Sequence, residues 1–125
     1  MTNSRAKQVG NAGEDLAARY LQSKYYEIID RNYRWARGEI DIVARLADTL
    51  VFVEVKTARG DHFGSPETWV NPRKQAQIGK VAQRYLQEKN IQDLNCRFDV
   101  VAIQKKEGGW HIEHYENAFW IEVDG

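Results

Sequence analysis

The chain has few residues that could form a covalent cross-link or a membrane anchor: it contains one cysteine and no apolar run long enough to cross a bilayer. It also has only two prolines. A single cysteine, Cys96, excludes an intramolecular disulfide, and the apolar run that follows it favours a packed core thiol over a nucleophile. The polar start, Met1 to Gln8, has no hydrophobic segment of the signal-peptide kind. We therefore expect a cytoplasmic protein that is neither exported nor inserted into a membrane.

The chain also lacks net charge, since 18 basic residues balance 18 acidic ones. This excludes the strongly basic composition of many nucleic-acid-binding domains, so any attraction for phosphate has to be local. The three histidines, His62, His111 and His114, are not spaced as a metal-binding set. With 42% hydrophobic residues, the whole chain, 1–125, fits one domain that can bury a core without disulfides or structural metal.

Hydrophobic periodicity and turn residues predict a mixed α/β order. A first helix is expected to begin near residues 10–13, followed by a strand over 27–33. Two more strands, a loop over 57–71 that is long enough to cover a substrate, and a second helix come next. Asn71 before Pro72 signals the start of that helix, which should end near residue 89. Further strands are expected over 98–103, 110–115 and 119–123.

What the chain does contain is acidic residues inside two strand-like runs, GEIDIV from residue 38 and VEVK from residue 53. Ionised groups in apolar strands need a partner or a ligand. Side chains alternate along a strand, so Glu54 and Lys56 share one face of the second run. In the first run, the isoleucines are expected on one face and the acids on the other.

The short link at Ala47-Asp48 favours a hairpin in which the numbers of facing residues sum to 95. Asp41 would then face Glu54, with Cβ atoms roughly 5 Å apart, and Glu39 would lie beside Lys56. Facing like charges destabilise a hairpin, whereas a shared divalent cation reverses that effect. We interpret the pair as the metal site of a phosphodiesterase. A one-residue slip in the register would separate the two acids.

Two residues on the helices are expected near these acids. Glu14 precedes two alanines by three and four residues, which places its carboxylate on the apolar side of the first helix, whereas Asp15 and Arg19 form an exposed pair. Alternatively, Glu14 is a solvated first-turn residue favoured by the helix dipole. Gln75 should point inward near the start of the second helix, as a catalytic residue or as a packing amide or cap.

Basic residues concentrate in three stretches that are either phosphate contacts or solvated faces. Aromatic residues accompany the first stretch, where Tyr33 and Trp35 either stack on bases or support the basic loop. The predicted nucleic-acid contacts are Arg31, Arg34, Arg37, Arg59, Arg73 and Lys74.

The element order, with an aspartate on the second strand and Glu-x-Lys on the third, resembles the PD-(D/E)xK nuclease superfamily, especially its small Holliday-junction-resolvase-like members. Five stretches spread over nearly the whole chain are similar to the bacterial YraN-like family. They are Gly10-x-x-Gly13-Glu14, Arg31-Asn32-Tyr33-Arg34, Gly38-Glu39-Ile40-Asp41, Val53-Glu54-Val55-Lys56-Thr57 and Phe98-Asp99-Val100-Val101. The resemblance implies a restriction-endonuclease-like αβββαβ core, in which two main helices flank a central mixed sheet.

The same resemblance implies that Glu14, Asp41, Glu54 and Lys56 are the site positions. Mg²⁺ or Mn²⁺ would be held by Asp41 and Glu54, with the carbonyl of Val55, water and a phosphate oxygen completing the shell. Glu14 would bind this metal through water or admit a second ion. Lys56 would orient or deprotonate the attacking water, or stabilise negative charge on the phosphate.

The expected function is therefore a metal-dependent endonuclease acting on DNA, with branched or repair intermediates as candidate substrates. A homodimer is an open alternative to a monomer, because junction-cutting relatives are commonly two-fold dimers. A processive exonuclease is disfavoured, because Val81 replaces glutamine in the Gln-x-x-x-Tyr arrangement that would end at Tyr85. Two other functions remain: a nucleic-acid-binding module that cuts nothing, and an interaction domain in which the charged residues form a structural ion-pair network.

Overall fold

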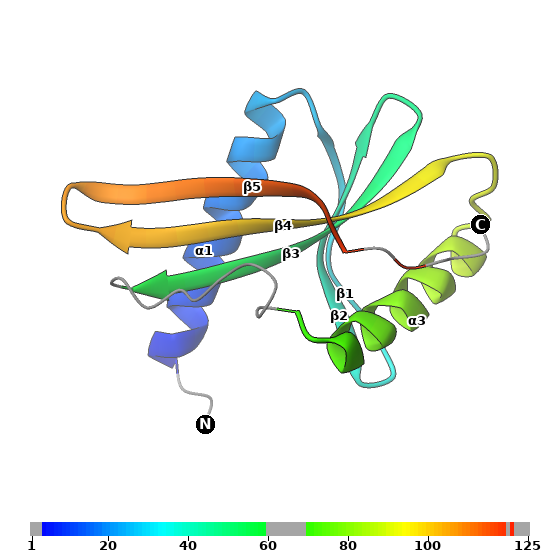
Figure 1. Ribbon diagram of the computed structural model, residues 1–125, viewed down its shortest axis with the longest axis horizontal. Helices are drawn as coiled ribbons and strands as arrows, with labels where there is room; N and C mark the ends of the chain where they lie inside the picture. Colours follow the sequence, from blue (N-terminus) through cyan, green and yellow to red (C-terminus); the bar gives the residue numbers. More distant parts are fainter. Residues whose placement is uncertain (1–3, 60–69, 120, 122–125) are drawn as a thin grey trace.

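The computed structural model describes residues 4–59, 70–119 and 121, and these residues fold as a five-stranded sheet with two helices (Figure 1). The expected mixed α/β fold is confirmed, and it is consistent with a restriction-endonuclease-like core. The elements are, in chain order, α1 (Ser4–Ser23), β1 (Glu27–Trp35), β2 (Gly38–Leu46), β3 (Thr49–Arg59), α3 (Pro72–Glu88), β4 (Asn95–Lys106) and β5 (Gly109–Phe119).

The strands lie in the order β1-β2-β3-β4-β5. The pair β3–β4 is parallel, and the pairs β1–β2, β2–β3 and β4–β5 are antiparallel. A parallel pair needs a crossover connection, and α3 lies in the segment between these two strands. The sheet is therefore mixed, with its one parallel step at the centre.

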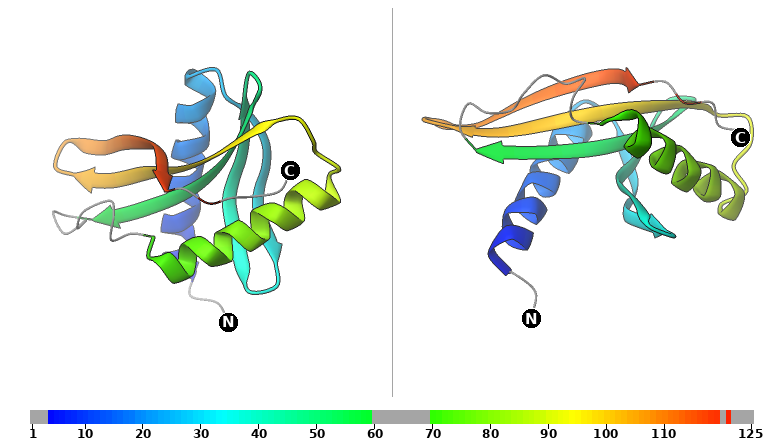
Figure 2. Two further views of the ribbon diagram at one scale, coloured as in Figure 1. Left: turned by 45° about the vertical axis from the view of Figure 1, so that its right-hand side comes forward. Right: turned by 60° about the horizontal axis from the view of Figure 1, so that its bottom comes forward.

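Each face of the sheet is covered by one helix (Figure 2). The α1 face buries Ala17 and Leu21 of the helix against Val51 and Val53 of β3. The α3 face buries a second cluster, in which the large side chains Phe52 and Tyr85 meet. Full burial of a side chain such as leucine or valine contributes about 1.5–3 kcal/mol, so these two clusters hold the layers together.

Helix α3 begins where its sequence predicts. Asn71 is the N-cap, with extended backbone, and its side chain accepts a hydrogen bond of 2.9 Å from the backbone N–H of Lys74. Pro72 occupies the first helical turn, where its missing N–H costs nothing. Helical spacing predicts an apolar stripe of Ile78, Val81, Ala82, Tyr85 and Leu86, and all five are buried against the sheet together with Gly79.

Helix α1 is longer than expected, because it begins at Ser4 and not near residues 10–13. Glu14 and Asp15 therefore lie in the middle of the helix, too far from its N-terminus for the helix dipole to favour their charges. Asp15 also pairs with Arg31 of β1, at 2.8 Å, where the sequence suggested Arg19. A contact between residues 16 positions apart depends on packing, which local spacing does not report.

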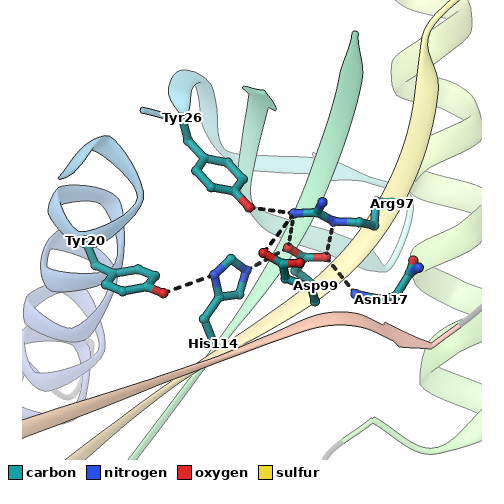
Figure 3. A network of polar contacts seen from close by, with 7 residues as sticks. Tyr20, Tyr26, Arg97, Asp99, His114 and Asn117 are labelled. Carbon is teal, nitrogen blue, oxygen red and sulfur yellow. Dashed lines mark hydrogen bonds and ion pairs between the residues drawn. The ribbon is translucent and has the colours of Figure 1, made fainter. Parts of the chain in front are cut away.

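Strand β5 includes the predicted strand 110–115 and continues to Phe119, with a bulge beside a buried charge, whereas most of the predicted strand 119–123 lies outside the described residues. Asp99 of β4 is fully buried and accepts hydrogen bonds from Arg97, from His114 and from the backbone N–H of Asn117 (Figure 3). Asn117 has φ +53°, at the register shift between β4 and β5. The carboxylate therefore holds β5 across its irregular stretch.

Burial alone would raise the pKa of Asp99, but the hydrogen bonds from His114 and Arg97 hold it below its ordinary value. Tyr26 accepts a hydrogen bond of 2.6 Å from Arg97, and the hydroxyl of Tyr20 lies 3.3 Å from the ring of His114 (Figure 3). The network thus joins β4 and β5 to α1 and to Tyr26, which directly precedes β1. It gives His114 a structural position that sequence spacing did not suggest.

Two expectations from composition can be compared with the structure. Cys96 is half-buried, and burial raises the pKa of its thiol, which agrees with a packed thiol and not with an activated nucleophile. Within the described residues, no helix combines the length and the apolar character needed to span a membrane.

Candidate metal-dependent site at the divergence of two strands

The candidate site lies where β2 and β3 separate. Their ladder follows the expected register, in which residue numbers sum to 95, from Leu46 opposite Thr49 to Ile42 opposite Val53. The ladder ends there, one step before the expected facing of Asp41 and Glu54. Figure 1 shows the two strands running apart beyond this point, β2 toward α3 and β3 away from it.

Asp41 bridges the opening between the two strands. Its Oδ2 accepts a hydrogen bond of 2.7 Å from the backbone N–H of Val55 on β3. In a strand, the N–H and C=O of one residue point to the same side, so the carbonyl of Val55 also points toward β2. The side chain and the carbonyl that sequence analysis assigned to one metal therefore lie on the same side of β3.

The divergence coincides with a break in the alternation of β2. Gly38 lies so close to α3 that a Cβ there would come within 2.4 Å of Val81, and Ile40 packs in the α3 cluster. Ile42, however, packs in the α1 cluster. The expectation that Ile40 and Ile42 share a face is therefore wrong, because the start of β2 follows α3 and leaves the plane of the sheet.

Asp41 is the most perturbed acid of the site. Burial, and then the charge of Glu54, raise its pKa from 3.8 to about 7, against the lowering effect of the Val55 hydrogen bond. The charges of Glu14 and Glu39 act in the same direction. At neutral pH the folded protein therefore resists placing a full negative charge at Asp41.

Glu54 lies on the α3 side of β3 and pairs with that helix. Burial raises its pKa, while Lys74, whose Nζ lies 2.8 Å from Glu54 Oε1, opposes that rise. Lys56 is exposed two residues along the strand, and its charge also lowers the pKa of Glu54. Glu54 and Lys56 thus lie on one strand as expected, but the ammonium that pairs with Glu54 is that of Lys74 on α3.

Glu14 reaches the site because α1 packs tightly on β3. A Cβ added at Gly13 would lie 2.2 Å from Thr57 Oγ1, so the glycine permits this approach. Burial raises the pKa of Glu14, Arg31 lowers it and Glu39 raises it. The carboxylate is therefore half-buried near other acids, as the apolar-side interpretation expected, and is no solvated first-turn residue.

Asn32 connects two of the acids. Arg31 pairs with Ile42 and Tyr33 pairs with Ile40, so Asn32, which lies between them, faces Asp41. The backbone of Asn32 has a φ of +55°. With its amide nitrogen turned toward the acids, Asn32 donates to Glu14 Oε1 at 2.9 Å and to Glu39 Oε1 at 2.8 Å. The site therefore contains a fourth carboxylate.

Glu39 is the residue that sequence reasoning missed. It was expected beside Lys56, but it lies 3.5 Å from Arg34 of β1 and within reach of Asn32. The signal was present, because Glu39 and Asp41 are two residues apart on one strand and so lie on the same side. Its charge adds to the negative field at Asp41 and Glu54.

The predicted nucleic-acid contacts fall into two groups. Arg31, Arg34 and Lys74 form ion pairs with Asp15, Glu39 and Glu54, respectively. Arg37 and Arg73 line a groove between the β1–β2 turn and α3. The side chain of Arg59 lies outside the described residues, as does most of the predicted loop, 60–69.

Gln75 and Tyr33 have structural contacts. The side-chain amide of Gln75 donates to the carbonyl of Val70, at 2.8 Å, which corresponds to the packing or capping alternative. The hydroxyl of Tyr33 donates to Glu88, and its ring meets Tyr85 edge-on with centroids 4.9 Å apart. Tyr33 therefore supports the β1–β2 hairpin against α3.

The donor set suits a hard divalent cation in chemistry. Carboxylate and carbonyl oxygens are the ligands that Mg²⁺ and Mn²⁺ prefer, and Asp41, Glu54 and the carbonyl of Val55 supply them. Over the described ranges, no three acidic, histidine or cysteine side chains are spaced closely enough to hold a metal by themselves. With two carboxylates, an ion would depend on water and substrate oxygens for the remaining positions, as Mg²⁺ commonly does.

Comparison with known proteins identifies the family of this chain. The model of the "Uncharacterised protein family UPF0102" matches residues 13–103. A UPF0102 protein of Geobacter sulfurreducens is 53% identical over 114 residues, covering 90% of this chain and 89% of its own. Another, of Alkaliphilus oremlandii, is 50% identical over 115 residues, covering 90% and 98%. The matched residues include all four acids and Lys56, and the chain belongs to UPF0102, the YraN-like family.

Proposed function

We propose that this protein is a Mg²⁺- or Mn²⁺-dependent nuclease, an endonuclease that acts on DNA. The observation that supports the proposal is the convergence of Glu14, Glu39, Asp41 and Glu54 from α1, β2 and β3. Acids that raise one another's pKa oppose folding in their charged forms, and such clusters are typical of functional sites. A bound divalent cation reverses the sign of these interactions.

Each residue has a role in phosphodiester hydrolysis. Asp41 and Glu54 would hold the cation with the carbonyl of Val55, and the cation, when bound, stabilises charge on the phosphate. The hydrogen bond from Val55 fixes one oxygen of Asp41 and leaves the other for this task. Lys56 is exposed beside Glu54, where its ammonium can orient the attacking water or neutralise the phosphate.

Glu14 and Glu39 form an outer pair. Asn32 donates to both, which holds the two carboxylates near one another, and both charges act on Asp41. Glu14 would bind water around the cation or admit a second ion, as the resemblance to resolvase-like nucleases implies, and Glu39 would add its charge beside it. Their charges also concentrate cations at the site before any substrate binds.

The test is cleavage of labelled DNA with Mg²⁺ or Mn²⁺, using linear duplex, flapped, single-stranded and four-way-junction substrates. Asp41→Asn and Lys56→Ala should each lower the rate by at least 100-fold, whereas Lys106→Ala, an exposed lysine at the end of β4, should not change it. Full activity in both site variants would refute the proposal. The homodimer stays a prediction, which analytical ultracentrifugation with and without a junction would test.

One observation favours a second candidate function, a nucleic-acid-binding module that does not cut. Lys74 already neutralises Glu54, so this acid is satisfied without a metal. The module would bind DNA with a steep salt dependence and leave it intact with every metal tested. Isothermal titration with Mn²⁺ separates the two functions, because a nuclease site must bind the ion and a satisfied ion pair need not.

A further inference from the structure

A groove of about 660 Å³ lies between the β1–β2 turn and α3. Its walls are Trp35 from the end of β1, Arg37 from the turn, and Arg73, Gln77 and Lys80 from the helix. The amide of Gln77 donates to the backbone carbonyl of Arg37, at 3.0 Å, so the two walls are tied together. The groove is therefore a built feature of the hairpin's attachment to α3.

The charge of the groove is of one sign. Its lining contains three basic side chains, Arg37, Arg73 and Lys80, and no acidic one among the described residues. Across the described ranges, none of the three lies within 4.0 Å of a carboxylate oxygen, unlike Arg31, Arg34 and Lys74 at the neighbouring acidic site. A concave surface with three such cations attracts a polyanion.

Trp35 gives the groove an aromatic wall that is already ordered. Its side chain is 42% exposed, and the guanidinium carbon of Arg84 lies 6.0 Å from its ring centroid. This cation–π contact, worth about 0.5–1 kcal/mol at an exposed site, favours the observed position of the ring and so lowers the ordering entropy that a stacking ligand would cost. An exposed aromatic between cations is typical of surfaces that bind single-stranded nucleic acid.

We infer that this groove binds an unpaired nucleotide of a nucleic-acid strand, with its base stacked on Trp35 and the flanking phosphates on Arg37, Arg73 and Lys80. A base inside a duplex cannot offer its face to a tryptophan, whereas every unpaired base can. The proposed ligand class is therefore single-stranded nucleic acid, or the unpaired part of a flap, loop or junction.

The groove lies beside the acidic site. Its role in substrate choice rests on the proposed function. Its residues Gly38 and Arg73 are chain neighbours of Glu39 and Lys74, which belong to the acidic site. The groove and the acidic site therefore meet at the start of β2 and at the first turn of α3. The nuclease would then prefer to cut next to unpaired nucleotides.

The first test is fluorescence anisotropy in EDTA, with a labelled 12-nucleotide DNA strand, an RNA strand of the same sequence, and the DNA duplex. Stacking of one base predicts that Trp35→Ala weakens single-strand binding roughly 5- to 100-fold and leaves duplex binding unchanged. Trp110→Ala is the matched control, because Trp110 is also exposed and also has a cationic side chain, that of Lys105, over its ring. The melting temperature of each variant verifies folding.

The second test is the salt dependence of single-strand binding. Replacing Arg37, Arg73 and Lys80 together with glutamine should flatten the slope of log K against log salt by about 2, because each phosphate contact on a single strand contributes about 0.7. Equal losses from Trp35→Ala and Trp110→Ala, equal affinity for strand and duplex, or an unchanged salt slope would overturn the inference. Since EDTA prevents cleavage, this result is independent of whether the acidic site cuts DNA.

Discussion

Removing the charge of Asp41 should stabilise the metal-free protein while abolishing its proposed activity. In Asp41→Asn, the amide oxygen still accepts the hydrogen bond from Val55, but the charge that burial and Glu54 oppose is gone. The wild-type pKa is about 7, above the ordinary 3.8, so the folded state holds a proton that the unfolded chain releases. Wild-type stability from this group is therefore full below about pH 4 and is lost as pH rises through 7.

The size of the effect follows from the same pKa. The difference between 3.8 and about 7 sets a ceiling of about 4 kcal/mol above pH 8, at about 1.4 kcal/mol for each tenfold change in proton affinity. Water and salt reach the site and screen part of this electrostatic effect. We therefore expect the free energy of unfolding of Asp41→Asn to be about 1–3 kcal/mol higher than that of the wild type. For a chain of this size, the melting temperature should rise by roughly 3–10 °C.

The assay is urea denaturation of the wild type and Asp41→Asn at pH 8 and pH 4 in EDTA, with Asp48→Asn at the exposed hairpin turn as the control. The stabilisation should be present at pH 8 and absent at pH 4. Added Mn²⁺ should then stabilise the wild type and leave the variant unchanged. A variant that is no more stable than the wild type at pH 8, or a stabilisation equal at both pH values, would refute the reasoning.

Three further predictions concern the surroundings of this site. Glu39→Gln should weaken Mn²⁺ binding several-fold in calorimetric titration, because one nearby negative charge is lost; unchanged affinity would exclude Glu39 from the site. Gly13→Ala should lower the free energy of unfolding by about 1–3 kcal/mol despite alanine's helix propensity, since its Cβ would meet Thr57. Thr57→Ala should restore most of that loss, and a stabilising Gly13→Ala would contradict the close contact. Asp99→Asn should cost about 3–5 kcal/mol at pH 7. Because the pKa of Asp99 is lowered, this difference should shrink as pH falls below 4, which acid denaturation curves would reveal.

The part of the site that sequence predicts is the part set by local rules. A two-residue link and alternating apolar residues are enough to place Ile42 opposite Val53, because both act over a few residues. The N-cap at Asn71 and the stripe of α3 are predictable for the same reason. The inward position of Glu14 also follows from helical spacing, although the helix begins earlier than expected.

The rest depends on packing between distant segments. The strands separate beyond Ile42 because Gly38 and Ile40 turn toward α3, and hairpin rules contain no information about a helix that follows 30 residues later. The ion pair between Lys74 and Glu54 and the network around Asp99 have the same origin. Local spacing indicates which residues are candidates for the site, whereas tertiary contacts decide which partner each one has.

The ion pair between Lys74 and Glu54 has a thermodynamic consequence. The ammonium 2.8 Å from Glu54 Oε1 and a metal ion on the same carboxylate repel each other, so the lysine disfavours metal binding at this acid. Linkage then requires that metal binding loosens Lys74 and that anything drawing Lys74 away tightens metal binding by the same factor. A substrate phosphate that binds the ammonium of Lys74 would draw it away from Glu54. Substrate and metal would therefore bind cooperatively without any movement of the backbone.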